Sequence, residues 1–151
     1  MRNNTRRSRK GFTLVELIVV IAIIGVLAAI IVPTTLHFVN QSRDEAASQE
    51  ISGIFNSIDG SLTLALANAE TINQSVVEGW LSTAGIAADD LSNTVTITIA
   101  VTAAVDTTPA SATLTVSTSR DGVEALTKTY NQVDEDTITA VTIELDPNAG
   151  A

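Results

Sequence analysis

Residues 9–33 of the chain read RKGFTLVELIVVIAIIGVLAAIIVP, and this stretch decides the N-terminal half of the fold. Phe12 to Val32 is a run of 21 residues in which only Thr13 and Glu16 are polar. An apolar helix of about 20 residues is long enough to cross a bilayer. A carboxylate at membrane depth costs about 2.5–3.5 kcal/mol on insertion scales. Glu16 is therefore a functional candidate that needs a partner.

The segment before the apolar run is basic, and the change in character lies at Lys10-Gly11-Phe12. No small-residue cleavage site of the ordinary secretory kind follows the apolar run. The positive-inside rule places the basic segment in the cytoplasm and everything after Val32 outside. This segment holds five of the eight basic residues of the chain, namely Arg2, Arg6, Arg7, Arg9 and Lys10.

The segment closely resembles the start of a type IV prepilin, a basic leader and a glycine followed by F-T-L-x-E-L-x-x-x-x-A-I-I-G-x-L-A-A-I-x-x-P. The resemblance runs without a gap over residues 9–33 and includes Gly25 and Pro33 at the spacing of the family. It implies that residues 1–11 are a leader, which a prepilin peptidase and N-methyltransferase removes after Gly11 before methylating the new Phe12 amine. It also implies the pilin fold.

The resemblance further implies a structural protein that polymerises with itself through its N-terminal helix, with the help of a pilus assembly machinery. The precursor is expected in the cytoplasmic membrane, with its head outside, and the assembled chain in an extracellular filament. Glu16 is then expected to accept the charged Phe12 amine of a neighbouring subunit. Segment 25–33 is expected to loosen on assembly. A simpler interpretation of Glu16 is an acid tolerated near the interface and favoured by the helix N-terminus.

Composition limits what the rest of the chain can do. A length of 151 residues allows one modest domain and an anchor. Without residues 1–11 the chain keeps three basic residues against 17 acidic ones, a side-chain charge of −14. Such a surface disfavours nucleic-acid binding, which needs a basic footprint. The chain has no cysteine, which excludes disulfides and makes it similar to the cysteine-free pilins.

A helix is expected from Phe12 to about Leu66, with residues 12–32 forming its transmembrane or filament-core part. In its second half the apolar residues recur at steps of three and four, which indicates one buried face. Gly53 and Gly60 lie within this half, and we expect them to pack closely against a sheet. The apolar face consists of Ala47, Ile51, Ile54, Ile58, Leu62 and Ala65.

Residues 67–151 are expected to form a small head with about four antiparallel strands, so the fold class is α+β. A connecting region over residues 68–93 contains a short helix with a capping box at Ser75, and Trp80 is expected to plug the core. Period-two alternation then predicts strands around residues 94–101, 113–117, 124–130 and 141–145, apolar toward the helix and rich in threonine on the other face.

The sequence shows no catalytic constellation, and we expect neither an enzyme nor a cofactor or metal site. His37 is the only histidine, and no nucleophile motif appears. The acidic runs at residues 89–90 and 134–136 lack the spacing of a calcium loop and are interpreted as solvated turns.

The favoured function is a major pilin, since Glu16 is present and the head is small. The alternative is a minor pilin or a pseudopilin of type II secretion or competence. A tethered binding protein would need a basic or aromatic patch on the head, and an anchored enzyme would need a polar cleft. The sequence indicates neither. A conducting filament is disfavoured because the chain has only five aromatic residues.

Overall fold

The computed structural model describes residues 11–149 of the chain. The predicted leader, residues 1–11, therefore lies outside the described residues except for Gly11. The chain divides into two units, residues 1–41 and residues 42–151. The elements of the described part are α1 (Leu14–Ala67), α2 (Gln74–Thr83), a short 3-10 helix η1 (Ala88–Asp90), β1 (Val95–Thr102), β2 (Ser111–Thr118), β3 (Leu126–Asn131) and β4 (Val141–Leu145).

Helix α1 continues through Pro33 without interruption. Proline has no backbone N–H and its ring crowds the preceding turn, so carbonyl groups in that turn lose their usual partners. The carbonyl that loses its donor is that of Ala29. Two hydroxyl groups just after the proline donate to a different carbonyl, that of Ile31: Thr34 Oγ1 at 2.9 Å and Thr35 Oγ1 at 2.8 Å. Thr34 also donates to Ile30 at 3.2 Å.

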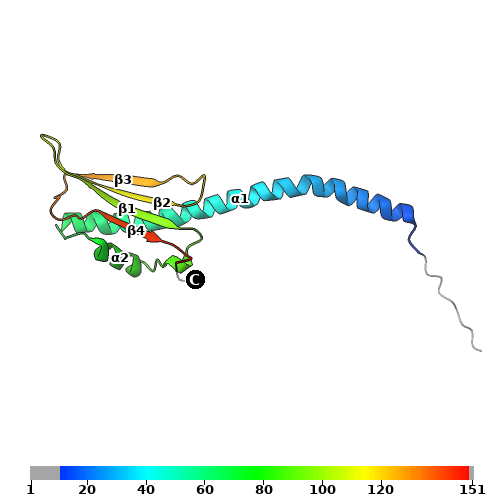
Figure 1. The fold of residues 1–151 in the computed structure, drawn as a ribbon, viewed down its shortest axis with the longest axis horizontal. Coiled ribbons are helices and arrows are strands. Elements are labelled where there is room, and N and C mark those ends of the chain that lie inside the picture. Colours follow the sequence, from blue (N-terminus) through cyan, green and yellow to red (C-terminus); the bar gives the residue numbers. More distant parts are fainter. Residues whose placement is uncertain (1–10, 150–151) are drawn as a thin grey trace, which may run out of the picture. The chain divides into compact units, whose positions relative to one another are not determined.

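The second unit has one hydrophobic core between α1, α2 and one face of the sheet (Figure 1). The α1 side chains in this core are those of the face that the sequence predicts: Ala47, Ile51, Ile54, Ile58, Leu62 and Ala65. Burial of such side chains at helical spacing holds the second half of α1 on the sheet. The predicted α+β class, a long helix packed on a small antiparallel sheet, is confirmed.

The four strands form one antiparallel sheet in the order β3-β2-β1-β4. The C-terminal strand β4 pairs with β1, where Ile143 lies opposite Ile97. A parallel bridge between Ile72 and Ile138 ties the approach to β4 to the segment that follows α1. Backbone pairing therefore holds the C-terminal region in this chain without cysteine.

The sheet presents one apolar and one polar face. Its inward side chains from β1 and β2 are fully buried, and its outward face carries threonines such as Thr115 and Thr127, whose hydroxyls lie 3.4 Å apart. Strand β3 begins at Leu126, two residues later than the predicted start. The chain at Arg120-Asp121-Gly122 turns as predicted, with Gly122 at φ +87°. The buried inward side chains are Val95, Ile97, Ile99, Ala112, Leu114 and Val116.

Two expectations for the second unit are wrong, and a third is confirmed only in part. Gly53 and Gly60 are exposed, and a Cβ atom at either position would meet nothing within 4 Å, so these glycines do not pack on the sheet. The cap of α2 is Asn73, whose side chain accepts a hydrogen bond from the N–H of Val76, and not Ser75. An asparagine two residues upstream caps equally well, and the helix begins earlier. Trp80 packs against the core as predicted, but it is only partly buried.

Candidate functional site

The start of α1 is a capping box built from Thr13 and Glu16. The N–H and the hydroxyl of Thr13 each donate to Glu16 Oε2 at 2.8 Å, and the N–H of Glu16 donates back to Thr13 Oγ1 at 3.2 Å. Reciprocal bonds of this kind satisfy N–H groups that a helix N-terminus leaves without partners. The motif Thr-x-x-Glu is visible in the sequence, so this second role of Glu16 could have been predicted from it.

The capping box uses only one oxygen of the Glu16 carboxylate. Among the described residues, Oε1 accepts no hydrogen bond, and Glu16 is exposed. Phe12 is the residue directly before the capping residue Thr13, and its side chain is 85% exposed. A group arriving from another chain therefore finds one carboxylate oxygen open at the tip of the helix.

The apolar half of α1 is not covered by any other part of the chain that the structure describes. Its large apolar side chains from Phe12 to Val32 are between 46% and 85% exposed. By length and composition alone, this helix is long and apolar enough to cross a membrane. An apolar surface of this size indicates a membrane or a protein–protein contact.

The other predicted site residues lie in the same segment. Gly11 precedes the helix, and Gly25 and Pro33 lie within it. All three are exposed, and a Cβ atom at Gly25 would meet nothing within 4 Å. Packing among the residues that the structure describes therefore gives no reason for glycine at position 25. The single chain brings Glu16 together with Thr13, but it brings neither Gly25 nor Pro33 to another site residue.

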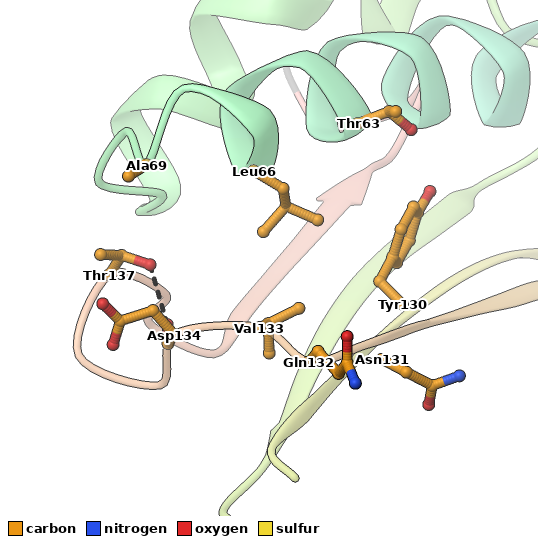
Figure 2. Close-up of a pocket in the computed structure, with 9 residues that line it drawn as sticks. All are labelled: Thr63, Leu66, Ala69, Tyr130, Asn131, Gln132, Val133, Asp134 and Thr137. Carbon is orange, nitrogen blue, oxygen red and sulfur yellow. Dashed lines mark hydrogen bonds between the residues drawn. The ribbon is translucent and has the colours of Figure 1, made fainter.

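The head has a shallow cavity of about 380 Å³ between the end of α1 and the segment after β3 (Figure 2). Leu66 and Tyr130 line its walls, and the only carboxylate lining it is that of Asp134. Asp134 Oδ1 accepts the N–H of Asp136 at 3.1 Å, and the hydroxyl of Thr137 donates to the Asp134 carbonyl at 2.8 Å. These bonds form a turn, and the lining carries no nucleophile–base pair.

Neither acidic run forms a metal site among the described residues. No group of three or more His, Cys, Asp or Glu side chains lies close enough together in residues 11–149 to hold an ion. In the run at residues 134–136, Glu135 Oε2 accepts the N–H of Ala104 at 3.0 Å and so ties two loops together. Asp89 and Asp90 lie in the short helix η1.

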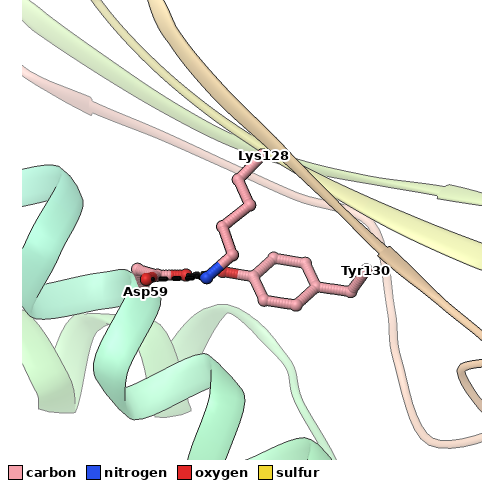
Figure 3. A network of polar contacts seen from close by, with 3 residues as sticks. All are labelled: Asp59, Lys128 and Tyr130. Atoms are coloured by element: carbon pink, nitrogen blue, oxygen red, sulfur yellow. Dashed lines mark hydrogen bonds and ion pairs between the residues drawn. The ribbon is translucent and has the colours of Figure 1, made fainter.

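Two ion pairs join α1 to β3 and to the turn between β2 and β3. Arg120 Nε lies 2.6 Å from Asp44 Oδ1. Lys128 Nζ lies 2.6 Å from Asp59 Oδ1 and 2.9 Å from Oδ2 (Figure 3). The hydroxyl of Tyr130 donates to the same carboxylate. Because Lys128 and Tyr130 both come from the edge strand β3, one helix carboxylate holds that strand in place.

The contacts among Asp59, Lys128 and Tyr130 shift the pKa values of Asp59 and Tyr130. The hydrogen bonds from Lys128 and then Tyr130 hold the pKa of Asp59 below its usual value of 3.8. Burial first, and then the bond to Asp59, raise the pKa of the Tyr130 phenol above its ordinary value, so the phenol stays protonated and donates. Asp59 therefore stabilises the fold fully above pH 3.8, and this contribution is lost as the pH falls through its lower folded pKa.

We expect Asp59→Asn to lower the free energy of unfolding at pH 7 by about 1 kcal/mol, because a partly exposed pair is lost. Acidification from pH 6 to pH 2 should then destabilise the variant less than the original chain. Denaturation of the full chain in detergent, followed by the fluorescence of its single tryptophan, measures both effects. Glu124→Gln removes an equal charge from an exposed loop and serves as the control. Equal pH profiles for Asp59→Asn and the original chain would contradict the assignment.

Sequence reasoning missed several of these residues. Thr13 was readable from the capping-box spacing, but the pairing of Asp59 with Lys128 was not, since these residues are 69 positions apart. The same holds for Arg120 and Asp44, which are 76 positions apart. No local pattern predicts which charge on a strand meets which charge on a helix.

Comparison with known families places the N-terminal segment. Residues 6–32 match the family described as the prokaryotic N-terminal methylation motif. The match covers Gly11, Phe12, Glu16 and Gly25 and ends one residue before Pro33. The predicted resemblance to type IV prepilins is thereby confirmed for this segment.

Individual relatives extend the similarity. The chain is 42% identical over 55 residues to the type IV major alpha-pilin of Moraxella bovis. The aligned segment covers 36% of this chain and 35% of that protein. It is 34% identical over 94 residues to fimbrial protein Q of the same organism, covering 60% and 59%. It is 39% identical over 54 residues to type II secretion system core protein G of Pseudomonas aeruginosa, covering 36% and 38%.

The matched part thus spans between about a third and three fifths of the length of these curated relatives. No solved structure matches the chain at a significant level.

Proposed function

We propose that this chain, with its N-terminal methylation motif and its similarity to type IV pilins, is a structural subunit of a type IV filament. It is made as a membrane precursor, cut after Gly11, methylated at Phe12 and polymerised through α1. The observation that carries the proposal is the apolar half of α1, whose side chains are exposed and uncovered within residues 11–149. A bilayer covers this surface in the precursor, and neighbouring helices cover it in a filament.

The chemistry of the tip supports the same proposal. Cleavage after Gly11 turns the Phe12 nitrogen into a cationic amine in an apolar setting, where an unpaired charge is costly. Glu16 supplies a carboxylate with one oxygen outside the capping box. A pair between the amine of one copy and Glu16 of the next neutralises both charges only when the copies assemble. The partners of this chain are then further copies of itself, the processing enzyme and the assembly machinery.

Mass spectrometry of filaments sheared from the producing cells tests the proposal. We expect a chain that begins at Phe12 and carries one methyl group on its amine. Membranes of cells that lack the processing enzyme provide the control, where residues 1–11 should remain attached. Filaments built of chains that begin at Met1 would contradict the proposal.

A pseudopilin or minor pilin is the second candidate, and the similarity to type II secretion core protein G favours it. The abundance of the chain distinguishes the two. A major subunit makes up most of the protein in sheared filaments, whereas a minor subunit is present in small amounts beside another pilin.

A further inference from the structure

Arg43 is a cation that has no ion-pair partner among residues 11–149 of an acidic chain. The part after Gly11 has three basic residues, and two of them, Arg120 and Lys128, pair with carboxylates of α1. Arg43 is exposed and forms no ion pair with any carboxylate in residues 11–149. A guanidinium group binds a carboxylate in a fork of two hydrogen bonds, so Arg43 suits a carboxylate from another molecule.

The proposed filament determines where along α1 of the neighbouring copy that carboxylate must lie. If the Phe12 amine of one copy meets Glu16 of the next, two parallel copies are displaced along α1 by four residues, or about 6 Å. Copies in a helical polymer are equivalent, so this displacement is the same at every level of the chain. Arg43 of the copy that provides the amine is then level with Ala47 of its neighbour. The carboxylates of Glu45 and Glu50 lie within about 5 Å of that level.

The direction in which each side chain leaves α1 distinguishes Glu45 from Glu50. Head-to-tail contacts join two different surfaces of the same chain, on roughly opposite sides of it. Glu45 follows Arg43 by about 200° around the helix, so the two side chains point to opposite sides. Glu50 follows Arg43 by seven residues and lies on the same side. Its Oε1 also accepts the N–H of Ser92 at 2.9 Å, whereas Glu45 is exposed and accepts no hydrogen bond from a described residue.

We propose that Arg43 forms an ion pair with Glu45 of an adjacent copy, a contact that rests on the proposed function and fixes the axial register of the filament. Both side chains lie on α1, two residues apart, in the part that follows its apolar half. The copies are then joined by two polar contacts, the pairing of Phe12 with Glu16 and the ion pair of Arg43 with Glu45 beside the head. It also gives a role to the one basic residue that the head leaves unused among residues 11–149.

Cross-linking between copies tests the contact, because the chain has no cysteine of its own. An Arg–Glu pair keeps its Cα atoms farther apart than the about 7 Å that a disulfide tolerates, so a short bismaleimide is the suitable reagent. Filaments that carry both Arg43→Cys and Glu45→Cys should yield a ladder of dimers, trimers and higher oligomers on a denaturing gel. Arg43→Cys with Glu50→Cys is the matched control and should yield monomers.

Charge exchange provides an independent measurement. Arg43→Glu and Glu45→Arg should each shift the filament–subunit equilibrium toward free subunits by about fivefold, the effect of losing one exposed pair. The double exchange should restore it. Glu124→Arg has the same charge change as Glu45→Arg but lies on a loop, and it should leave assembly unchanged.

The outcomes separate this contact from the proposed function. No ladder in normal filaments of the double cysteine variant, or no rescue by the double exchange, overturns the contact and leaves the pilin proposal standing. If the original chain forms no filaments, the proposed function itself fails. If both cysteine pairs give a ladder, the reagent links any cysteines within its length, and the cross-link does not depend on which carboxylate faces Arg43. This result also overturns the contact.

Discussion

Replacing Glu16 with alanine is expected to abolish filament assembly or reduce it at least tenfold, while cleavage after Gly11 proceeds normally. The substitution removes a charge from the apolar segment, so the precursor should insert into the membrane as well or better. The loss arises in the polymer, where the Phe12 amine stays buried without a carboxylate. Leaving one charge of a buried pair alone costs about 3–5 kcal/mol, far more than the tenfold change requires.

Alanine at position 16 also breaks the capping box with Thr13, so a second variant must separate the two roles of the carboxylate. Glu16→Gln keeps a side chain that can accept from the Thr13 N–H, because glutamine serves in capping boxes as glutamate does. It carries no charge for the amine. We therefore expect Glu16→Gln to assemble as poorly as Glu16→Ala. Thr13→Ala removes the cap and keeps the charge, and we expect it to assemble nearly normally.

The measurement compares two quantities in the same cells: the amount of processed chain in the membrane and the amount in sheared filaments. The pairing predicts equal processed chain in all variants and filaments only where Glu16 is retained. Normal filaments from Glu16→Gln together with poor ones from Thr13→Ala would assign Glu16 to capping. The pairing between copies would then be wrong.

The sequence predicts the elements of this fold well, because period and burial are local properties. All six members of the predicted helix face are buried, and the alternation in β1 and β2 places Ile97, Ile99 and Leu114 inward. Each of these positions follows from the repeat of a helix or a strand alone. The same reasoning locates the apolar segment and its single acid.

The arrangement of the elements could not be predicted in the same way. Strand β4 pairs with β1, across the sheet from β3, and the period of Val141, Ile143 and Leu145 is the same whichever strand they join. The glycines of α1 misled the prediction because a glycine can mark close packing or a solvated position. Gly53 and Gly60 occupy solvated positions in the single chain.

The candidate site shows a different limit. The motif identifies Gly11, Phe12 and Glu16 from type and spacing, and the fold positions Glu16 at a capped helix start. The partner that the sequence assigns to Glu16 is the amine of another copy, and this amine exists only after cleavage. One uncleaved chain therefore contains the Glu16 carboxylate but not the Phe12 amine, and the pairing stays a prediction.

The helix is expected to open between Gly25 and Pro33 when subunits assemble. In the single chain α1 is continuous there, as a bilayer requires, because backbone groups in lipid must be satisfied within the segment. The residues nevertheless have poor helix propensity: Gly25 is flexible, and Val26, Ile30, Ile31 and Val32 are β-branched. Pro33 removes one hydrogen bond and biases Val32 toward extended geometry.

Assembly changes the balance because neighbouring helices replace lipid around this segment. Freed carbonyl and N–H groups can then find partners in other copies, and Thr34 and Thr35 already donate to Ile30 and Ile31. Each opened residue lengthens the chain by about 1.8 Å, since an extended residue spans about 3.3 Å against about 1.5 Å in a helix. A filament with this segment open should therefore stretch under load more readily than one with a continuous helix.

A density map of the filament measures the opening directly, and paired substitutions supply its control. Gly25→Ala with Pro33→Ala restores helix propensity at both ends of the segment without new contacts inside the chain, since the space around Gly25 is open. We expect an extended stretch within residues 25–33 in the original filament and a continuous, stiffer helix in the double variant. If the original filament shows an unbroken helix through these residues, the segment stays helical even after neighbouring helices have replaced the lipid. The propensity argument for its opening would then fail.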